Sequence, residues 1–268
     1  MNFRDLILEN PLLIEFKRNL RRFFLVGRGR KANTGIFIMA GLLYLFIFMI
    51  VFAARRDLTV SAISVCQLAL LSFIVPAMMH GSIAGERERR SWDMLLVAPI
   101  SNRQIIFGKF ISGGAMIALT TVLFWPMIVA IYPYDNGAPI ASLVGQQMTV
   151  ATYGFFVAGL SMYISSRCHR AFAANLIIFG TVFVLLVVLP MFLAMAFTRG
   201  PDQSVVWYFH PFWTVLTMNP TSSGYDTTRA MNSGYGVIQS IAYMVTAFVL
   251  LAFAESSFRS IDQRVGSQ

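Results

Sequence analysis

One segment of the chain, residues 85–103 with the sequence GERERRSWDMLLVAPISNR, carries acidic and basic residues at close spacing. Glu86 and Arg90, and Arg89 and Asp93, are oppositely charged pairs four residues apart. Side chains at that spacing are neighbours on a helix. The pairs predict a short helix with a charged face, whose chemistry is recognition of another surface rather than catalysis. A solvated loop that only sets membrane topology is the alternative interpretation.

The same segment also carries an apolar face. Trp92, Leu95 and Leu96 fall on one side of the predicted helix, Pro99 ends it, and Ser101 can cap the helix that follows. So short a loop offers this face no partner of its own. We therefore expect the segment to dock onto another cytoplasmic protein, with the tryptophan as anchor.

Catalytic, metal and nucleotide sites are not indicated elsewhere. His80 and His169 lie in separate places without a second ligand, so interfacial or structural roles are favoured. Gly108-Lys109 lacks the upstream glycine and the following Ser or Thr of a phosphate-binding loop. Because the apolar stretches contain no Asp, Glu, Lys or Arg, a membrane-embedded hydrolase or proton-coupled carrier is disfavoured as well. We predict no enzymatic activity and no bound metal or cofactor.

The elements that must position the segment are membrane helices. The 268 residues are 57% hydrophobic and only 12% charged, with a mean hydropathy of +0.66. About 20 apolar residues cross a bilayer as a helix, which excludes a soluble enzyme, a nucleic-acid-binding module and a secreted disulfide scaffold. Six stretches without Asp, Glu, Lys or Arg predict six spans, namely 32–54, 58–85, 110–134, 136–166, 171–198 and 230–254.

Basic residues predict the orientation of these spans. Of the 21 Lys and Arg, 17 lie in the N-terminal segment, in the loops after the second and fourth stretches, and in the tail. Since cytoplasmic loops carry the basic excess, both termini are expected in the cytoplasm. We interpret residues 1–268 as a single transmembrane domain, with a cytoplasmic interfacial helix in 1–31, the membrane part in 32–254 and a cytoplasmic tail in 255–268.

The N-terminal segment contains an amphipathic pattern at residues 10–24, NPLLIEFKRNLRRFF. It is too charged to span and suits a helix lying on the anionic cytoplasmic surface of the membrane lipid. A helix packed on other cytoplasmic protein is the alternative. The residues expected at the membrane interface are Phe16, Arg18, Leu20, Arg21 and Arg22.

Residues 203–225 are uncharged but broken by His210 and Pro211. Their short apolar part favours an external re-entrant hairpin before the sixth span over a further crossing. A seventh span, which would place the C-terminus outside, is the alternative. The residues expected to form an aromatic belt there are Trp207, Tyr208, Phe212 and Trp213.

Prolines inside three of the predicted spans, Pro76, Pro126 and Pro190, are interpreted as packed kinks. Spanning helices tolerate proline when a neighbour satisfies the carbonyl that proline leaves without a donor. A secondary carrier with broken helices is a less favoured interpretation, because no carboxylate accompanies these prolines.

The charged segment resembles the loop signature of ABC-2 type transporter permeases. The matching residues are Glu86-Arg87-Glu88, Ser91, Asp93, Leu95-Leu96 and Pro99-Ile100-Ser101. The chain departs from that signature at Arg90, where glycine is common, and at Asp93, where Glu is common. The arrangement of an interfacial helix, six spans and an external hairpin resembles the same family over nearly the whole chain.

The resemblance implies an all-helical permease of the cell membrane that pairs with a second copy or a paralogue. ATP and Mg²⁺ would be held by partner ATP-binding subunits, onto which the loop helix docks. Glu86, Arg87, Glu88, Arg89, Ser91, Trp92, Asp93, Leu95, Leu96 and Pro99 would then couple the ATPase to the spans. A scaffold of such a machine without cargo is an alternative. Gly154 and Ala158 are candidates for contacts between the two permeases, with packing inside one subunit as the alternative.

Overall fold

The structure, a computed structural model, describes residues 30–89, 102–135, 139–196, 210–218 and 226–265. Helices account for almost all of these residues, and no strand occurs among them. The helices in chain order are α3 (Arg30–Ala53), α4 (Val60–Met79), α5 (Ala84–Glu88), α7 (Asn102–Ile131), η1 (Tyr132–Tyr134), α8 (Ile140–Arg167), α9 (Ala171–Phe183), η2 (Val184–Val188), α10 (Leu189–Ala196), α12 (Pro211–Thr217) and α13 (Asp226–Val265).

Five helical segments are long and apolar enough to cross a membrane: Val60–Glu88, Arg103–Tyr134, Ile140–Arg167, Ala171–Phe192 and Gly236–Ser257. The all-helical, multi-pass character predicted from composition is therefore confirmed. The first predicted span falls on α3, a helix of 24 residues. Within the described residues, the apolar part of α3 is Gly41–Ala53, which is shorter than the five candidate spans.

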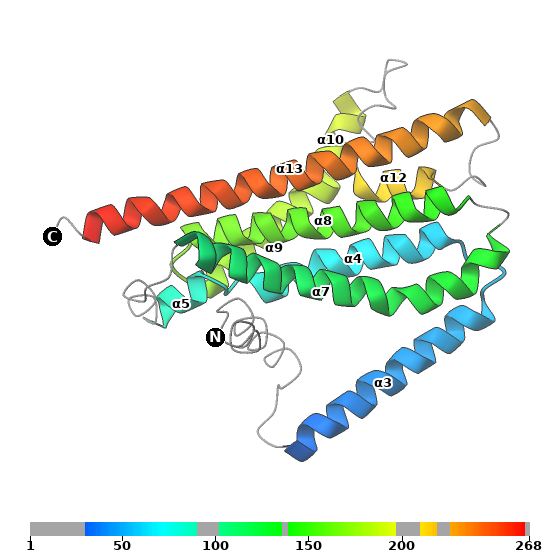
Figure 1. Cartoon of the computed structure of the whole chain (residues 1–268), viewed down its shortest axis with the longest axis horizontal. Helices are drawn as coiled ribbons and strands as arrows, with labels where there is room; N and C mark the ends of the chain where they lie inside the picture. The colour runs from blue at the N-terminus through cyan, green and yellow to red at the C-terminus, as the bar shows by residue number, and fades with distance from the viewer. Residues whose placement is uncertain (1–29, 90–101, 136–138, 197–209, 219–225, 266–268) are drawn as a thin grey trace, which may run out of the picture.

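Helix α8 lies at the centre of the bundle (Figure 1). α13 packs along it on one side, α4 and α7 pack on it as well, and α3 diverges from the others while resting on α7. Small residues allow these close approaches. A Cβ added to Gly159 would lie 3.0 Å from the backbone oxygen of Ala247 in α13, and one added to Gly154 would lie 2.9 Å from Ile117 in α7.

The small pair predicted as a candidate contact between permeases is therefore used within one subunit. Gly154 faces α7, and Ala158 is fully buried. The structure favours the alternative of intrasubunit packing, because α8 has neighbours on several sides and has no room for bulkier residues there.

Large apolar side chains also cover the outside of the bundle, among them Phe46, Phe73, Val129, Phe172 and Val249. A contiguous apolar exterior of this kind is unfavourable in water and favourable in lipid. Between the helices, neutral polar groups pair. Gln146 Nε2 donates to Ser61 Oγ at 3.0 Å, Gln147 Nε2 donates to Ser64 Oγ at 3.2 Å, and the hydroxyls of Ser72 and Tyr153 lie 2.7 Å apart.

The two ends of the bundle differ in charge. α5, the start of α7, the end of α8 and the end of α13 lie together at one end, on the left of Figure 1. We call this the α5 end. This end contains the described parts of the loops and the tail that the distribution of basic residues predicts to lie on the same side of the membrane. Arg103 of the second loop pairs there with Glu255 of the tail.

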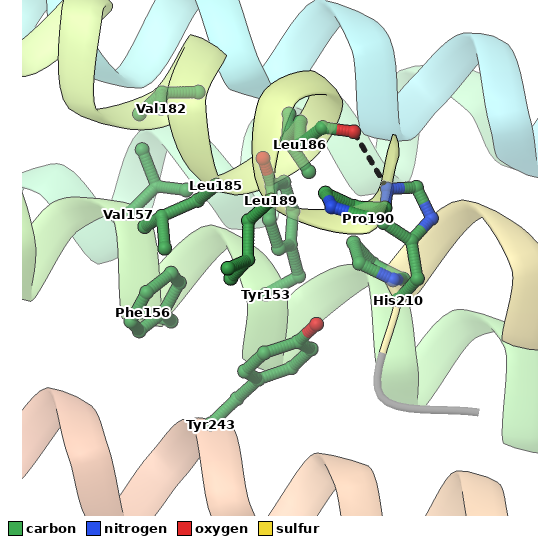
Figure 2. A pocket seen from close by; sticks show the side chains of 11 residues that line it. Tyr153, Phe156, Val157, Val182, Leu185, Leu186, Leu189, Pro190, His210 and Tyr243 are labelled. Atoms are coloured by element: carbon green, nitrogen blue, oxygen red, sulfur yellow. Dashed lines mark hydrogen bonds between the residues drawn. The ribbon is translucent and has the colours of Figure 1, made fainter. Parts of the chain in front are cut away.

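The fifth predicted span bends where α9 gives way to η2 and α10. In the π turn the Leu189 N–H bonds to Val184 O. Pro190 has no N–H to give to the carbonyl of Leu186 four residues earlier. His210 Nε2 lies 2.9 Å from that oxygen (Figure 2), and it must donate because a carbonyl only accepts. The predicted packed kink at Pro190 thus has its neighbouring donor.

Residues 203–225 contain the short helix α12, which begins after His210 and packs on α4 and α8. Seven residues rise only about 10 Å, so α12 alone cannot cross the roughly 30 Å hydrocarbon core. Phe212 is half-buried and Trp213 is exposed. The two other aromatic-belt residues, Trp207 and Tyr208, lie outside the described residues, as do all five residues predicted at the membrane interface.

Candidate functional site

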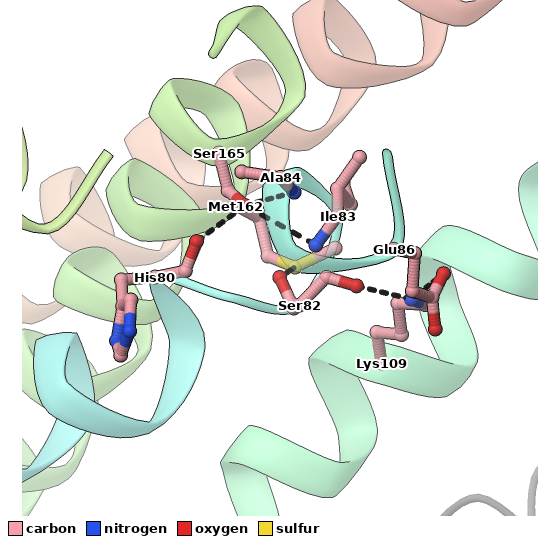
Figure 3. A network of polar contacts seen from close by, with 8 residues as sticks. All are labelled: His80, Ser82, Ile83, Ala84, Glu86, Lys109, Met162 and Ser165. Carbon is pink, nitrogen blue, oxygen red and sulfur yellow. Dashed lines mark hydrogen bonds and ion pairs between the residues drawn. The ribbon is translucent and has the colours of Figure 1, made fainter. Parts of the chain in front are cut away.

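The beginning of the charged segment is fixed to α8 by one serine. Ser165 Oγ accepts from the backbone N–H groups of Ile83 and Ala84, at 3.2 and 3.1 Å. The same hydroxyl donates to His80 O at 2.7 Å. These contacts appear together in Figure 3. The side chain of the residue before α5 does not cap the first amides of this helix. Ser165, 81 positions from Ala84 in the sequence, supplies the cap instead.

A buried ion pair fixes α5 to α7. Glu86 Oε2 lies 2.6 Å from Lys109 Nζ, and the lysine side chain is only 3% exposed. The ammonium also donates to Ser82 O (Figure 3). A buried cation is tolerated only when it is paired and hydrogen-bonded. The position of α5 therefore depends on α7 keeping Lys109 within reach.

Two further contacts use the charge at helix ends. Arg87 donates from its guanidinium to Ser166 O at 2.7 Å, at the carboxyl end of α8. Glu88 Oε2 accepts from the Ala171 N–H at 3.0 Å, in the first turn of α9. A cation at a helix carboxyl end and an anion at an amino end are each stabilised by the helix dipole. α5 is thus held by α7, α8 and α9 at once.

The last contact lies just after residues 90–101, the part of the loop outside the described residues. Arg103 Nε is 2.8 Å from Glu255 Oε1, joining the start of α7 to α13. Arg103 is mostly exposed to solvent. Together with the three contacts of α5, this pair connects both ends of the charged segment to the spans. We call the four contacts the loop junction: Glu86–Lys109, Arg87–Ser166, Glu88–Ala171 and Arg103–Glu255.

The predicted coupling residues divide into two groups. Glu86, Arg87 and Glu88 lie in α5, and Arg89 follows in a turn. Six lie outside the described residues, namely Ser91, Trp92, Asp93, Leu95, Leu96 and Pro99. No described contact tests the roles of either group in coupling.

Among the described residues, the helical part of this segment is α5, which ends at Glu88. Glu86 pairs there with Lys109 of α7, a contact that the sequence did not predict. The predicted pairs Glu86–Arg90 and Arg89–Asp93 include residues outside the described part of the chain, so they stay predictions.

Sequence reasoning missed Lys109 and Ser165. Lys109 directly precedes a stretch of 25 uncharged residues, 110–134, which was a usable sign that it lies near the membrane boundary. Ser165 is one of several small residues near the end of α8 and carries no such signal. Among the described residues no group of three His, Cys, Asp or Glu side chains could hold a metal ion.

Comparison with known proteins assigns the chain to a family. Residues 68–262 match the family described as ABC-2 family transporter protein. The chain belongs to this family, whose members are the transmembrane component of ABC transporters and not the ATPase. It is a multi-pass protein of the cell membrane.

Curated relatives agree with the family. The chain is 30% identical over 149 residues to the probable multidrug ABC transporter permease YbhR of Escherichia coli K12, and equally to that of Escherichia coli O157:H7. The match covers 55% of this chain and 37% of each relative. The chain therefore spans little more than a third of the relatives it matches.

Proposed function

We propose that the chain is the permease subunit of an ATP-driven exporter. Two copies, or this chain with a paralogue, would form the path, and ATP with Mg²⁺ would bind to the cytoplasmic ATP-binding subunits. The observation that carries the proposal is the loop junction, in which a segment matching the family's loop signature contacts three helices within three residues, Glu86 to Glu88.

The junction suits transmission of force because its contacts resist sliding. Withdrawing α5 from α7 would leave Lys109 buried without its carboxylate, which is strongly unfavourable. A displacement imposed on the segment beyond Arg89 is therefore expected to carry α7, α8 and α9 with it. In this proposal Glu86, Arg87 and Glu88 transmit the motion, whereas Trp92, Leu95 and Leu96 dock on the ATPase.

The proposed cargo class is supported by the neutral side chains that α4 and α8 bury and by the names of the relatives. The relatives are named as multidrug permeases, and neutral side chains such as Gln67 and Gln146 form the buried polar groups of α4 and α8. We propose amphipathic or lipophilic molecules as cargo. Six spans with both termini in the cytoplasm complete the proposal, α3 being the first span.

The docking step is tested with two tryptophan variants. Trp92→Ala should weaken copurification with the ATP-binding subunit isolated with the wild-type chain by about thirtyfold, because truncating an interface anchor commonly costs about 2 kcal/mol. Trp213→Ala, at an exposed tryptophan of α12, is the matched control and should bind normally. Equal retention of the ATPase by both variants would contradict the docking role.

The orientation is tested with single cysteines in a chain whose Cys66 and Cys168 are replaced. An impermeant thiol reagent applied to intact cells should label Asn136→Cys and leave Arg89→Cys and Ser260→Cys unlabelled. Labelling of Arg89→Cys would reject the orientation. Labelling of Ser260→Cys while Ser222→Cys stays unlabelled would instead show a seventh span.

A further inference from the structure

A cavity of about 170 Å³ lies between α8, the α9–η2–α10 segment, the start of α12 and α13. Figure 2 shows the side chains of these elements directed toward one space, with Tyr153 and Phe156 from α8 and Tyr243 from α13. The cavity is separate from the loop junction.

The cavity follows from specific backbone chemistry. The π turn of η2 widens the helix by one residue per turn, and Pro190 interrupts the next turn. His210 then donates from Nε2 to the Leu186 carbonyl, which Pro190 leaves without a backbone donor. This bond holds the start of α12 against the bend. A proline, a π turn and a histidine from separate elements thus hold the space open, and π turns are frequent at functional sites.

The walls define the chemistry of an occupant. The rings of Phe156 and Tyr243 stack at 5.3 Å between centroids, and Tyr153 meets Tyr243 edge-on at 5.8 Å. The remaining described walls are mainly aliphatic, and no Asp, Glu, Lys or Arg is among the described residues that line the cavity. Burial lowers the pKa of His210 below its ordinary value, so its imidazole is neutral at neutral pH. The site thus offers aromatic faces and no charge.

The rim of the cavity faces the outside of the bundle. Leu189, which lines it, is 42% exposed, and the adjacent surface carries exposed apolar residues such as Phe192 and Val188. A molecule dissolved in the bilayer can therefore enter sideways between α10 and α13. An apolar protein cavity of about 150 Å³ holds a benzene molecule, so this half-open space suits one or two rings.

We propose that this cavity binds a neutral aromatic molecule of one or two rings, taken from the bilayer into a single subunit. The aromatic walls favour ring stacking over a lipid acyl chain, and the lack of a charged wall disfavours anions and cations alike. Binding at this site requires neither ATP hydrolysis nor a second permease, so it stands independently of the proposed function.

The test uses photo-crosslinking of the full chain in lipid nanodiscs. Benzophenone, a neutral two-ring ketone, is both probe and crosslinker, and 4-benzoylbenzoate is its anionic counterpart. Peptide mapping should show saturable benzophenone adducts on cavity residues such as Val157, Leu185 and Tyr243. The anionic probe should give at least tenfold fewer adducts there.

Matched variants decide the assignment. Leu189→Trp fills the mouth and should lower cavity adducts at least tenfold, whereas Leu176→Trp, at an exposed leucine of the same span, should leave them unchanged. Leu185→Trp, deeper in the wall, provides a second blocking variant, and size-exclusion profiles confirm folding. The proposal would be overturned if the amount of adduct rose with probe concentration without saturation over lipid-facing residues. It would also be overturned if cavity adducts persisted in both blocking variants. Excess phospholipid that abolishes the adducts would show an acyl chain as the occupant and would also overturn it.

Discussion

The α5 end and the middle of the bundle hold the same helices together by different chemistry. At the α5 end the ties are ionic or charge-assisted, as in Glu86–Lys109 and Arg87–Ser166. In the middle they are neutral, as in Ser72–Tyr153, and toward the opposite end they stay neutral, as in Gln146–Ser61. Charge is expensive in hydrocarbon, so charged ties are confined to a boundary where water can solvate the outer partners.

The difference in chemistry implies a difference in mechanical stiffness. A neutral hydrogen bond within a membrane bundle contributes only about 0.6 kcal/mol on average, because the separated groups find other partners. A buried charge without its partner has no comparable alternative. The α5 end is therefore the rigid attachment, and the middle is the part in which helices can move relative to one another.

The largest expected effect is at the buried ion pair. Glu86→Gln leaves Lys109 buried without its carboxylate and should lower the unfolding free energy in detergent by about 3–5 kcal/mol. The double variant Glu86→Leu with Lys109→Met should recover most of that loss, since no charge remains. A double-mutant cycle measures the coupling. Small, additive losses would show that the pair is not rigid and would remove the contrast with the middle.

A smaller loss is expected from Ser165→Ala. This variant removes the acceptor for two amides at the start of α5 and should lower stability by about 1–2 kcal/mol, as for a lost helix cap. Ser161→Ala is the control on the same helix, because its hydroxyl donates to Val157 O within α8. Hydrogen exchange of residues 83–88 should quicken in the first variant. Equal behaviour of the two serines would refute the capping role.

Among the neutral ties, Gln146→Leu should lower stability by about 0.6 kcal/mol. Met148→Leu, at an exposed position of the same helix, is the control and should be neutral. Thermal unfolding in a single detergent compares them. A loss as large as that of Glu86→Gln would mean that the neutral layer, too, is a rigid attachment.

The smallest effect is expected at the half-exposed pair of the α5 end, in which Arg103 is 67% exposed and Glu255 is 17% exposed. Arg103→Gln should leave the unfolding midpoint almost unchanged, because water already solvates the guanidinium. Glu255→Gln should behave in the same way, and added salt should not alter either result. A clear drop in midpoint would indicate that charge alone, rather than burial, sets the stiffness of this end.

Much of the architecture was predictable because bilayer thickness sets a length scale that composition reveals directly. The uncharged stretches 58–85, 110–134 and 136–166 each match a candidate span. The loop signature at Glu86–Glu88 predicted the family, which the comparison confirmed. The capped kink at Pro190 followed from the rule that its freed carbonyl needs a donor, although the sequence did not identify His210 as that donor.

What the sequence determined by itself was which segments enter the membrane, because hydropathy and charge act locally along the chain. Only the tertiary structure decided which residues pair. Glu86 lies 23 positions from Lys109, Ser165 lies 81 from Ala84, and His210 lies 24 from Leu186. Each pairing depends on how antiparallel helices align when they pack, and packing geometry is a property of several segments together that no local pattern records.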